Sequence, residues 1–201
     1  VNVTGTAEFA VSKYDRDLGT ITDATLNSYA FNLQGGFSVG TEIDMNLAGA
    51  IAVVTVNDNA DNAIYTAIKV QDANVTASTG TDTFGLDGQL DIDYYHSNSA
   101  ADGYDRLDWT NAFEGGVIWN PGANLPTPAN LDIDFTSDMH YRVAGTVSGD
   151  QNNGNTILTA GDVNVTGTAE FAVSKYDRDL GTITDATLNS YAFNLQGGFS
   201  V

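Results

Sequence analysis

Three turn-like segments concentrate aspartate and asparagine, whose side-chain oxygens are the ligands that Ca²⁺ prefers. Their candidate ligands are Asn57, Asp58 and Asp61, then Asp102, Asp105 and Asp108, and finally Asp150, Asn152 and Asn155. The third segment begins like a calcium loop, but its glycine comes one position early and no glutamate stands at the twelfth position. Aspartate and asparagine also form turns without any ligand. Each cluster therefore has two interpretations, and we expect calcium at one or more of them.

Catalytic chemistry has little support in the sequence. His96 and His140 are the only side chains suited to act as bases at neutral pH, and neither lies near a nucleophile motif. The chain has no cysteine, which excludes disulfides, zinc–thiolate sites and cysteine nucleophiles. We therefore expect that the protein is not an enzyme.

Aromatic residues gather around an irregular segment, residues 97–128, that contains both tryptophans and all three prolines. Flat aromatic rings stack on sugars, so these residues could form a carbohydrate-binding platform: Tyr94, Tyr95, Tyr104, Trp109 and Trp119. The alternative is that the rings anchor a loop or fill a core. A repeated carbohydrate-binding module with a glycan ligand is thus the rival functional hypothesis.

The chain is strongly acidic, with 26 acidic and 7 basic residues and a net charge of −19. Such a surface repels nucleic acid and anionic membranes, so we exclude both as partners. The longest apolar stretch, Leu47 to Val56, is about half the length that spans a membrane, and no signal peptide is evident. An acidic, cysteine-free chain rich in glycine and threonine indicates an extracellular or cell-surface protein.

The hydrophobic pattern predicts strands almost throughout, because apolar residues alternate with polar ones and helical periodicity is nearly absent. Predicted strands include Val1 to Val11, Ile21 to Leu33, Phe37 to Leu47, Ala50 to Val56, Ile64 to Val70, Leu90 to Tyr94, Leu131 to Phe135, His140 to Val147 and Thr156 to Leu158. Gly35 and Gly36 predict a break between two of them. About nine to twelve strands favour an all-β fold, namely a β-sandwich or jelly-roll-like domain.

The chain contains an exact internal repeat: residues 163–201 are identical to residues 1–39. Solvent-facing positions are free to drift, so this identity indicates a recent tandem duplication or a repeating polymer. We divide the chain into one repeat unit, residues 1–162, and a copy of its first 39 residues, 163–201, which either starts the next repeat or serves as a donor segment.

The duplication predicts self-association. If residues 40–162 take up one copy, the other copy is left with unpaired strand edges, which are templates for another chain. The apolar residues expected to carry this contact are Val1, Val3, Phe9 and Val11, with their copies Val163, Val165, Phe171 and Val173. A head-to-tail contact that does not close into a ring produces a filament. Deleting one copy is then expected to leave a soluble monomer.

The run KYDRDLGTITDATL at residues 13–26 and the later VVTVN at residues 53–57 resemble secreted bacterial "choice-of-anchor" domains, which often accompany PEP-CTERM sorting tails. The resemblance implies a secreted, surface-anchored β-sandwich and assigns no functional residues. Together with the repeat, it favours a structural subunit of an extracellular filament, biofilm matrix, surface array or adhesin stalk. The expected partner is another copy of the protein, with calcium stiffening the junctions.

Overall fold

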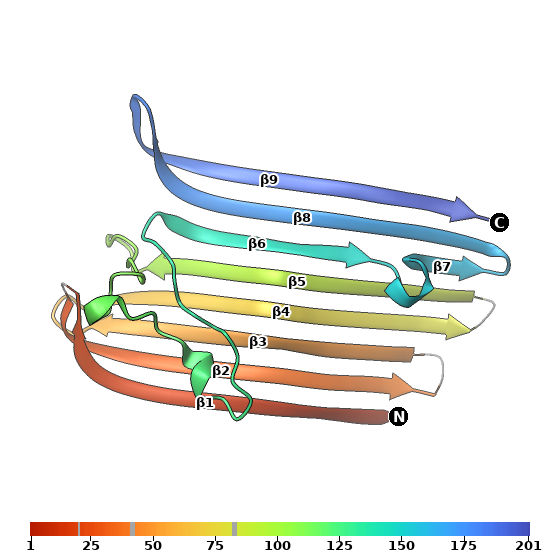
Figure 1. The fold of residues 1–201 in the computed structure, drawn as a ribbon, viewed down its shortest axis with the longest axis horizontal. Coiled ribbons are helices and arrows are strands. Elements are labelled where there is room, and N and C mark those ends of the chain that lie inside the picture. The colour runs from red at the N-terminus through yellow and green to blue at the C-terminus, as the bar shows by residue number, and fades with distance from the viewer. Residues whose placement is uncertain (20, 41–42, 82–83) are drawn as a thin grey trace.

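A computed structural model describes residues 1–19, 21–40, 43–81 and 84–201, with the side chains of residues 81, 84 and 152 left out of the description. The predicted all-β fold is confirmed: within these residues, nine strands form one antiparallel sheet (Figure 1). The strands are β1 (Asn2–Leu18), β2 (Ile21–Val39), β3 (Ile43–Asp58), β4 (Ala63–Thr81), β5 (Phe84–Ala100), β6 (Met139–Ser148), β7 (Thr156–Ala160), β8 (Val163–Leu180) and β9 (Ile183–Ser200).

The sheet follows the chain order from β1 to β6, with each strand beside the next, and then continues through β8 to β9. The short strand β7 lies in line with β6, because both pair with β5 on one side and with β8 on the other. A loop with the short 3-10 helix η3 (Gln151–Asn153) separates β6 from β7. Strands β6 and β7 therefore act as one interrupted row between β5 and β8, and we call it the β6/β7 row.

The strands are longer than the hydrophobic pattern predicts. β1 and β2 pair without interruption from Asn2–Ser38 to Arg16–Ala24, so the predicted break at Gly35 and Gly36 is wrong. The glycines have a packing role instead, since a Cβ on Gly35 would lie 3.4 Å from the carbonyl oxygen of Thr4 on β1 and one on Gly36 would lie 2.7 Å from Asn46 Oδ1 on β3. Small residues here let two long backbones approach closely.

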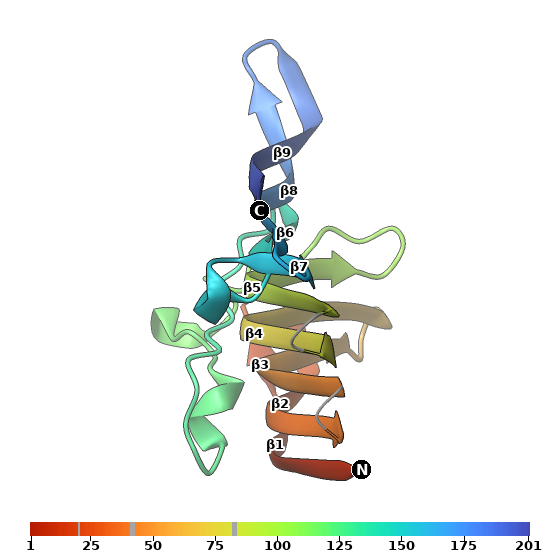
Figure 2. The same ribbon diagram turned by 90° about the vertical axis from the view of Figure 1, so that its right-hand side faces the viewer.

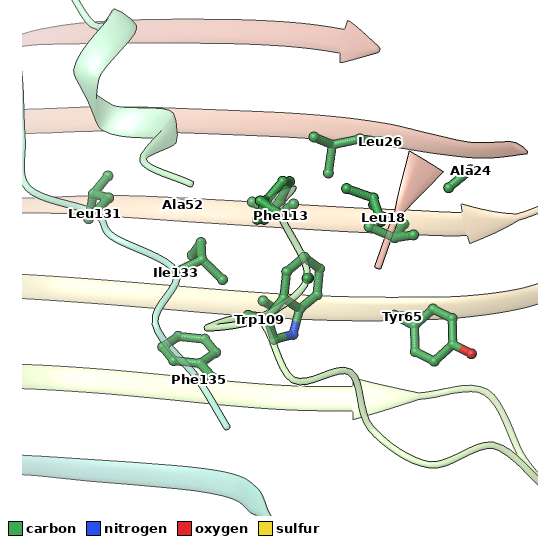
Figure 3. Close-up of a cluster of buried hydrophobic side chains, with 14 of the residues drawn as sticks. Leu18, Ala24, Leu26, Ala52, Tyr65, Trp109, Phe113, Leu131, Ile133 and Phe135 are labelled. Atoms are coloured by element: carbon green, nitrogen blue, oxygen red, sulfur yellow. The ribbon is translucent and has the colours of Figure 1, made fainter. Parts of the chain in front are cut away.

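A second layer covers one face of β1–β5. It is the segment 101–138, which contains the 3-10 helices η1 (Glu114–Gly116) and η2 (Pro121–Asn124), and we call it the cover (Figure 2). The cover and the sheet enclose a core in which Trp109, Phe135 and Leu26 are fully buried (Figure 3). The β8–β9 hairpin extends beyond the cover (Figure 2).

The predicted strand Leu131 to Phe135 belongs to the cover and is not a strand, apart from an isolated bridge between Ile133 and Trp119. Its alternating pattern still holds: Leu131, Ile133 and Phe135 are buried, whereas Asp134 is exposed. An extended segment that crosses the face of a sheet has the same two-residue period as a strand, which is why the pattern did not separate the two.

Buried polar groups fix the cover on the sheet. Asn98 on β5 accepts a hydrogen bond from the Trp109 indole (3.0 Å) and donates to the backbone of Leu107 and Thr136. Lys69 on β4 donates to the carbonyl oxygen of Asp132 (2.7 Å). These contacts pair the buried polar side chains of Asn98 and Lys69 with the cover, so the cover has one defined position.

Candidate self-association site

The two copies of the repeated segment fold into the same hairpin. Phe9 lies opposite Phe31 in β1–β2, and Phe171 lies opposite Phe193 in β8–β9; both hairpins have a register shift two residues before their turn. The sequence therefore determines the hairpin locally. The two copies differ in the strand through which each hairpin pairs with the rest of the sheet.

The second hairpin docks through β8, along nearly the whole length of that strand. Residues 168–176 pair with β6, from Ser148–Thr168 to Met139–Tyr176, and residues 163–166 pair with β7. This places the identical copy of β1 against the β6/β7 row. The first hairpin uses its other strand: β2 pairs with β3 from Ala24–Asp58 to Val39–Ile43.

Apolar side chains fill the β8 junction. Val173 lies opposite Val143 and is half-buried, whereas its equivalent Val11 on β1 is 62% exposed. Phe171 lies opposite Gly145, where a Cβ would come within 3.1 Å of the Phe171 ring. The predicted self-assembly residues thus divide into two groups. Phe171, Val165 and Val173 are half-buried in the junction, Val163 is 37% exposed beside it, and the four in the first copy are exposed: Val1, Val3, Phe9 and Val11.

A charged cluster holds the turn end of β8. The carboxylate of Asp177 accepts hydrogen bonds from His140 Nε2 (2.8 Å), from the Arg106 guanidinium and from Thr187 Oγ1 (3.0 Å). The Arg106 guanidinium also lies 3.3 Å from His140 Nδ1. The hydrogen bond from His140, followed by those from Arg106 and Thr187, lowers the pKa of Asp177 to about 2 against a partial opposing effect of burial.

The equivalent aspartate in the first copy lacks this cluster. Asp15 accepts one side-chain hydrogen bond, from Thr25 Oγ1 (2.9 Å), which is the counterpart of the bond from Thr187. Asp15 lies on β1, which is an outer strand, whereas Asp177 lies at the same position of β8, which pairs with β6. Local sequence gave no signal for the cluster, because Arg106 and His140 lie 71 and 37 residues before Asp177.

Two outer strand edges remain open among the described residues, those of β1 and β9. β1 and β9 are the outer strands of two copies of the same hairpin. In each copy, the open edge is the one through which the other copy pairs with the rest of the sheet. The outer edge of β1 is the edge through which β8 binds the β6/β7 row, and the outer edge of β9 is the edge through which β2 binds β3. The two ends of the sheet are therefore complementary in sequence and register.

The predicted calcium ligands lie at separate places, and their oxygens mostly stabilise turns. Asp58 Oδ1 accepts from the backbone of Ala60 and Asp61 (2.9 and 3.2 Å). Asp108 accepts from Thr110 and Asn111; although burial raises its pKa, these hydrogen bonds outweigh that effect and lower it. Of the other predicted ligands in these two clusters, Asn57 pairs within β3, and Asp102 and Asp105 lie in the cover.

The third cluster forms the turn between β6 and β7. The carbonyl oxygen of Asp150 accepts from the backbone of Asn153 and Asn155, and the side chain of Asn152 lies outside the description. Asp150 also lines a shallow pocket with Asp44 and Asp87, and the pKa of Asp87 is raised by burial and then by the charge of Asp150. No group of three or more acidic or histidine side chains within the described residues is arranged to hold a metal ion.

The aromatic residues do not form one exposed platform. Trp109 is buried in the core, and Trp119 packs against Phe113 and Tyr14 while its indole donates to Ser28 (3.1 Å). Tyr94 and Tyr95 are half-buried, and Tyr104 is exposed. Both tryptophans therefore act as anchors of the cover.

The two histidines also have structural surroundings. His96 is 4% exposed, stacks on Phe135 and accepts a hydrogen bond from Arg142 (2.7 Å). Burial, followed by the charges of Arg142 and Lys69, lowers its pKa to about 4, so the ring is neutral at pH 7. His140 belongs to the Asp177 cluster described above.

Comparison with known proteins gave no relative: no family model, curated protein or solved structure matches the chain. None of the described helices is long and apolar enough to cross a membrane.

Proposed function

We propose that the protein is an extracellular structural subunit that assembles with copies of itself, head to tail, into a filament, surface array or adhesin stalk. The main support is the docking of residues 163–201, an exact copy of residues 1–39, on the β6/β7 row of the preceding unit. If every unit repeats this contact, the sheet continues from one unit to the next without a break in its ladder. The acidic, cysteine-free composition supports a location outside the cell.

The contact joins two different edges, so it repeats without limit unless its rotation closes a ring. The outer edge of β1 supplies one side, and the β6/β7 row supplies the other. Backbone hydrogen bonds give such a junction its strength, and the opposed side chains give its register. Val11, Phe9 and Asp15 would meet Val143, Gly145 and the Arg106–His140 pair of a neighbour, as their copies do within this chain.

The docking of both hairpins in one chain changes the expected effect of deleting one. Among the described residues, the buried apolar side chains of the core all lie between Leu18 and Met139, so a polypeptide of residues 1–162 keeps this core. It loses only β8–β9, and the β6/β7 row becomes an open edge at the opposite end of the sheet from the intact β1 edge. A single repeat should therefore polymerise instead of remaining a monomer.

The test is negative-stain electron microscopy and sedimentation of residues 1–162, in enough salt to screen the −17 charge of one unit. We expect filaments whose formation rises with concentration. Val11→Asp places a carboxylate opposite Val143 of the neighbour and should abolish them, while leaving the monomer folded because Val11 is exposed. Val117→Asp, the same change at an exposed valine of the cover, is the matched control and should leave the filaments unchanged.

Monomers of the single repeat under all these conditions would reject the proposal. Filaments that tolerate Val11→Asp would show that another surface joins the units. Calcium in the junctions stays a prediction, and grids prepared with calcium and with chelator test it directly.

A further inference from the structure

The β8–β9 hairpin exposes a face that its identical copy buries. Leu18 and Leu26 are 0% exposed beneath the cover, whereas Leu180 and Leu188 are 47% and 39% exposed. Ile183 is likewise exposed, and its copy Ile21 is in the core. The same apolar side chains at the same hairpin positions thus lack a layer over them, because the cover of this unit lies over β1–β5 and reaches β8 only near Tyr176 and Asp177 (Figure 2).

The polar partners on that face are also different in the two copies. In the first hairpin, Ser28 accepts from the Trp119 indole, and the Glu8 carboxylate accepts from the backbone and hydroxyl of Thr127 (3.1 and 2.9 Å). In the second hairpin, Ser190 is exposed and Glu170 accepts instead from Asn194 (2.9 Å). Two of the groups that bind the cover in one copy therefore face solvent or a strand neighbour in the other.

The open edge of β9 carries the matching register. In the first copy, Asn27 and Thr55 lie opposite each other on β2 and β3, and their side chains are 3.5 Å apart (Nδ2 to Oγ1). Asn189 is the copy of Asn27, and no strand within the described residues lies beside it on the outer edge of β9. An unpaired edge next to an uncovered apolar face is a docking surface for a sheet and its second layer together.

We infer that β9 and the adjoining face bind residues 40–162 of a second copy of the repeat once that copy has released its own first hairpin, with β3 of that copy pairing with β9 and its cover closing over Leu180, Ile183 and Leu188. The partner is identified by sequence identity, since the same hairpin binds the same residues within this chain. The inference rests on the proposed function and names its second interface. Each hairpin would then be held on both edges, by β6/β7 of one unit and by β3 of the next.

The experiment opens the β3 edge in the full chain and asks what fills it. Ala30→Pro places proline at the buried centre of β2, where it cannot continue the ladder, and so releases the first hairpin. The chain has no cysteine, so Asn189→Cys with Thr55→Cys gives a clean disulfide reporter. We expect the triple variant to form a ladder of disulfide-linked multimers on non-reducing gels.

Two matched controls exploit the identity of the copies. Adding Ala192→Pro, the same substitution in the second hairpin, should abolish the ladder because β9 then loses its own pairing edge. Asn27→Cys with Thr55→Cys, without proline, should give an internal disulfide and a monomer. A folded Ala30→Pro chain that stays monomeric and reduced under oxidising conditions would overturn the inference.

A longer polypeptide provides the test if the Ala30→Pro variant fails to fold. Here residues 40–162 are repeated after Val201, and the disulfide is sought between Asn189→Cys and the Thr55→Cys of the added copy. It should form as completely as the Asn27–Thr55 reporter, and its absence would overturn the inference. If residues 1–162 form filaments that depend on Val11 but this disulfide does not form, the proposed function holds and only the second interface is rejected. If the disulfide forms but the filaments do not, the second interface holds and the proposed function is rejected.

Discussion

Leu26 and Leu188 show how far tertiary context decides what a residue contributes. They occupy the same position of the same 39-residue sequence, yet Leu26 is fully buried and Leu188 is 39% exposed. The stabilisation by a buried leucine depends on the atoms around it, including the cavity that remains when it is removed. The two copies therefore form an internal comparison in which local sequence is constant.

We predict that Leu26→Ala lowers the free energy of unfolding by about 2–5 kcal/mol, the range for a buried leucine. Leu188→Ala should lower it by less than about 1 kcal/mol, because the side chain already contacts solvent. Urea unfolding followed by the fluorescence of Trp109 and Trp119 measures both, since these side chains lie between cover and sheet. Equal effects of the two substitutions would mean that the second hairpin is covered as fully as the first.

At the residue scale, sequence reasoning found the turns and missed the contacts. The acidic clusters were placed in turns, as Asp58 and Asp150 show, but composition alone does not tell a turn-forming aspartate from a calcium ligand. The Asp177 cluster had no local signature at all. It depends on a strand pairing between distant residues, which no spacing in the sequence encodes.

At the scale of elements, alternation predicted most of the strands because the sheet has one face under the cover. It failed where another factor dominates. Gly35 and Gly36 lie inside β2 because strand pairing there overrides the tendency of glycine to end a strand. Strand order and the docking of β8 on β6 were beyond prediction, since identical hairpins carry identical local signals.

The Asp177 cluster makes the docking of β8 depend on pH. Hydrogen bonds from His140, Arg106 and Thr187 lower the pKa of Asp177 from 3.8 to about 2, so the stabilisation is present above pH 3.8 and is lost as the pH drops toward 2. We expect the NMR signals of β8 amides to broaden or shift in that window before those of β3. Asp177→Asn should loosen β8 at neutral pH and remove this step.

Asp15→Asn is the control for that prediction, because it changes the same residue in the copy that lacks Arg106 and His140. In the full chain, Asp15→Asn should leave the NMR signals of the β1 and β8 amides as stable toward low pH as in the unmodified protein. In residues 1–162, by contrast, it should weaken filaments, since Asp15 would there take the place of Asp177. Loosening of β8 by Asp15→Asn would show that the effect is not specific to the cluster.

At the scale of the whole molecule, the duplication was expected to leave one copy unpaired, whereas both copies are docked in the same chain. The difference has a thermodynamic consequence. Two such chains can join only by exchanging one docked hairpin for an identical one, so the number of contacts does not change. A chain of residues 1–201 should therefore be a poor polymer former, while a single repeat, with its β6/β7 row open, gains contacts whenever it adds a neighbour.

We predict that residues 1–201 terminate filaments made of residues 1–162. The longer chain retains an open β1 edge and can add to the exposed β6/β7 row at a filament end, but its own row is already filled by β8. It then presents β9, and an incoming repeat could pair its β3 there only by releasing its own β2. Growth at that end should stop, so the mean filament length measured by electron microscopy should fall as the proportion of the longer chain rises. Val11→Asp in residues 1–201 should remove this effect, because the chain can no longer add to the filament. Lengths that do not respond to residues 1–201 would mean that the filaments grow through a contact other than the one between β1 and the β6/β7 row.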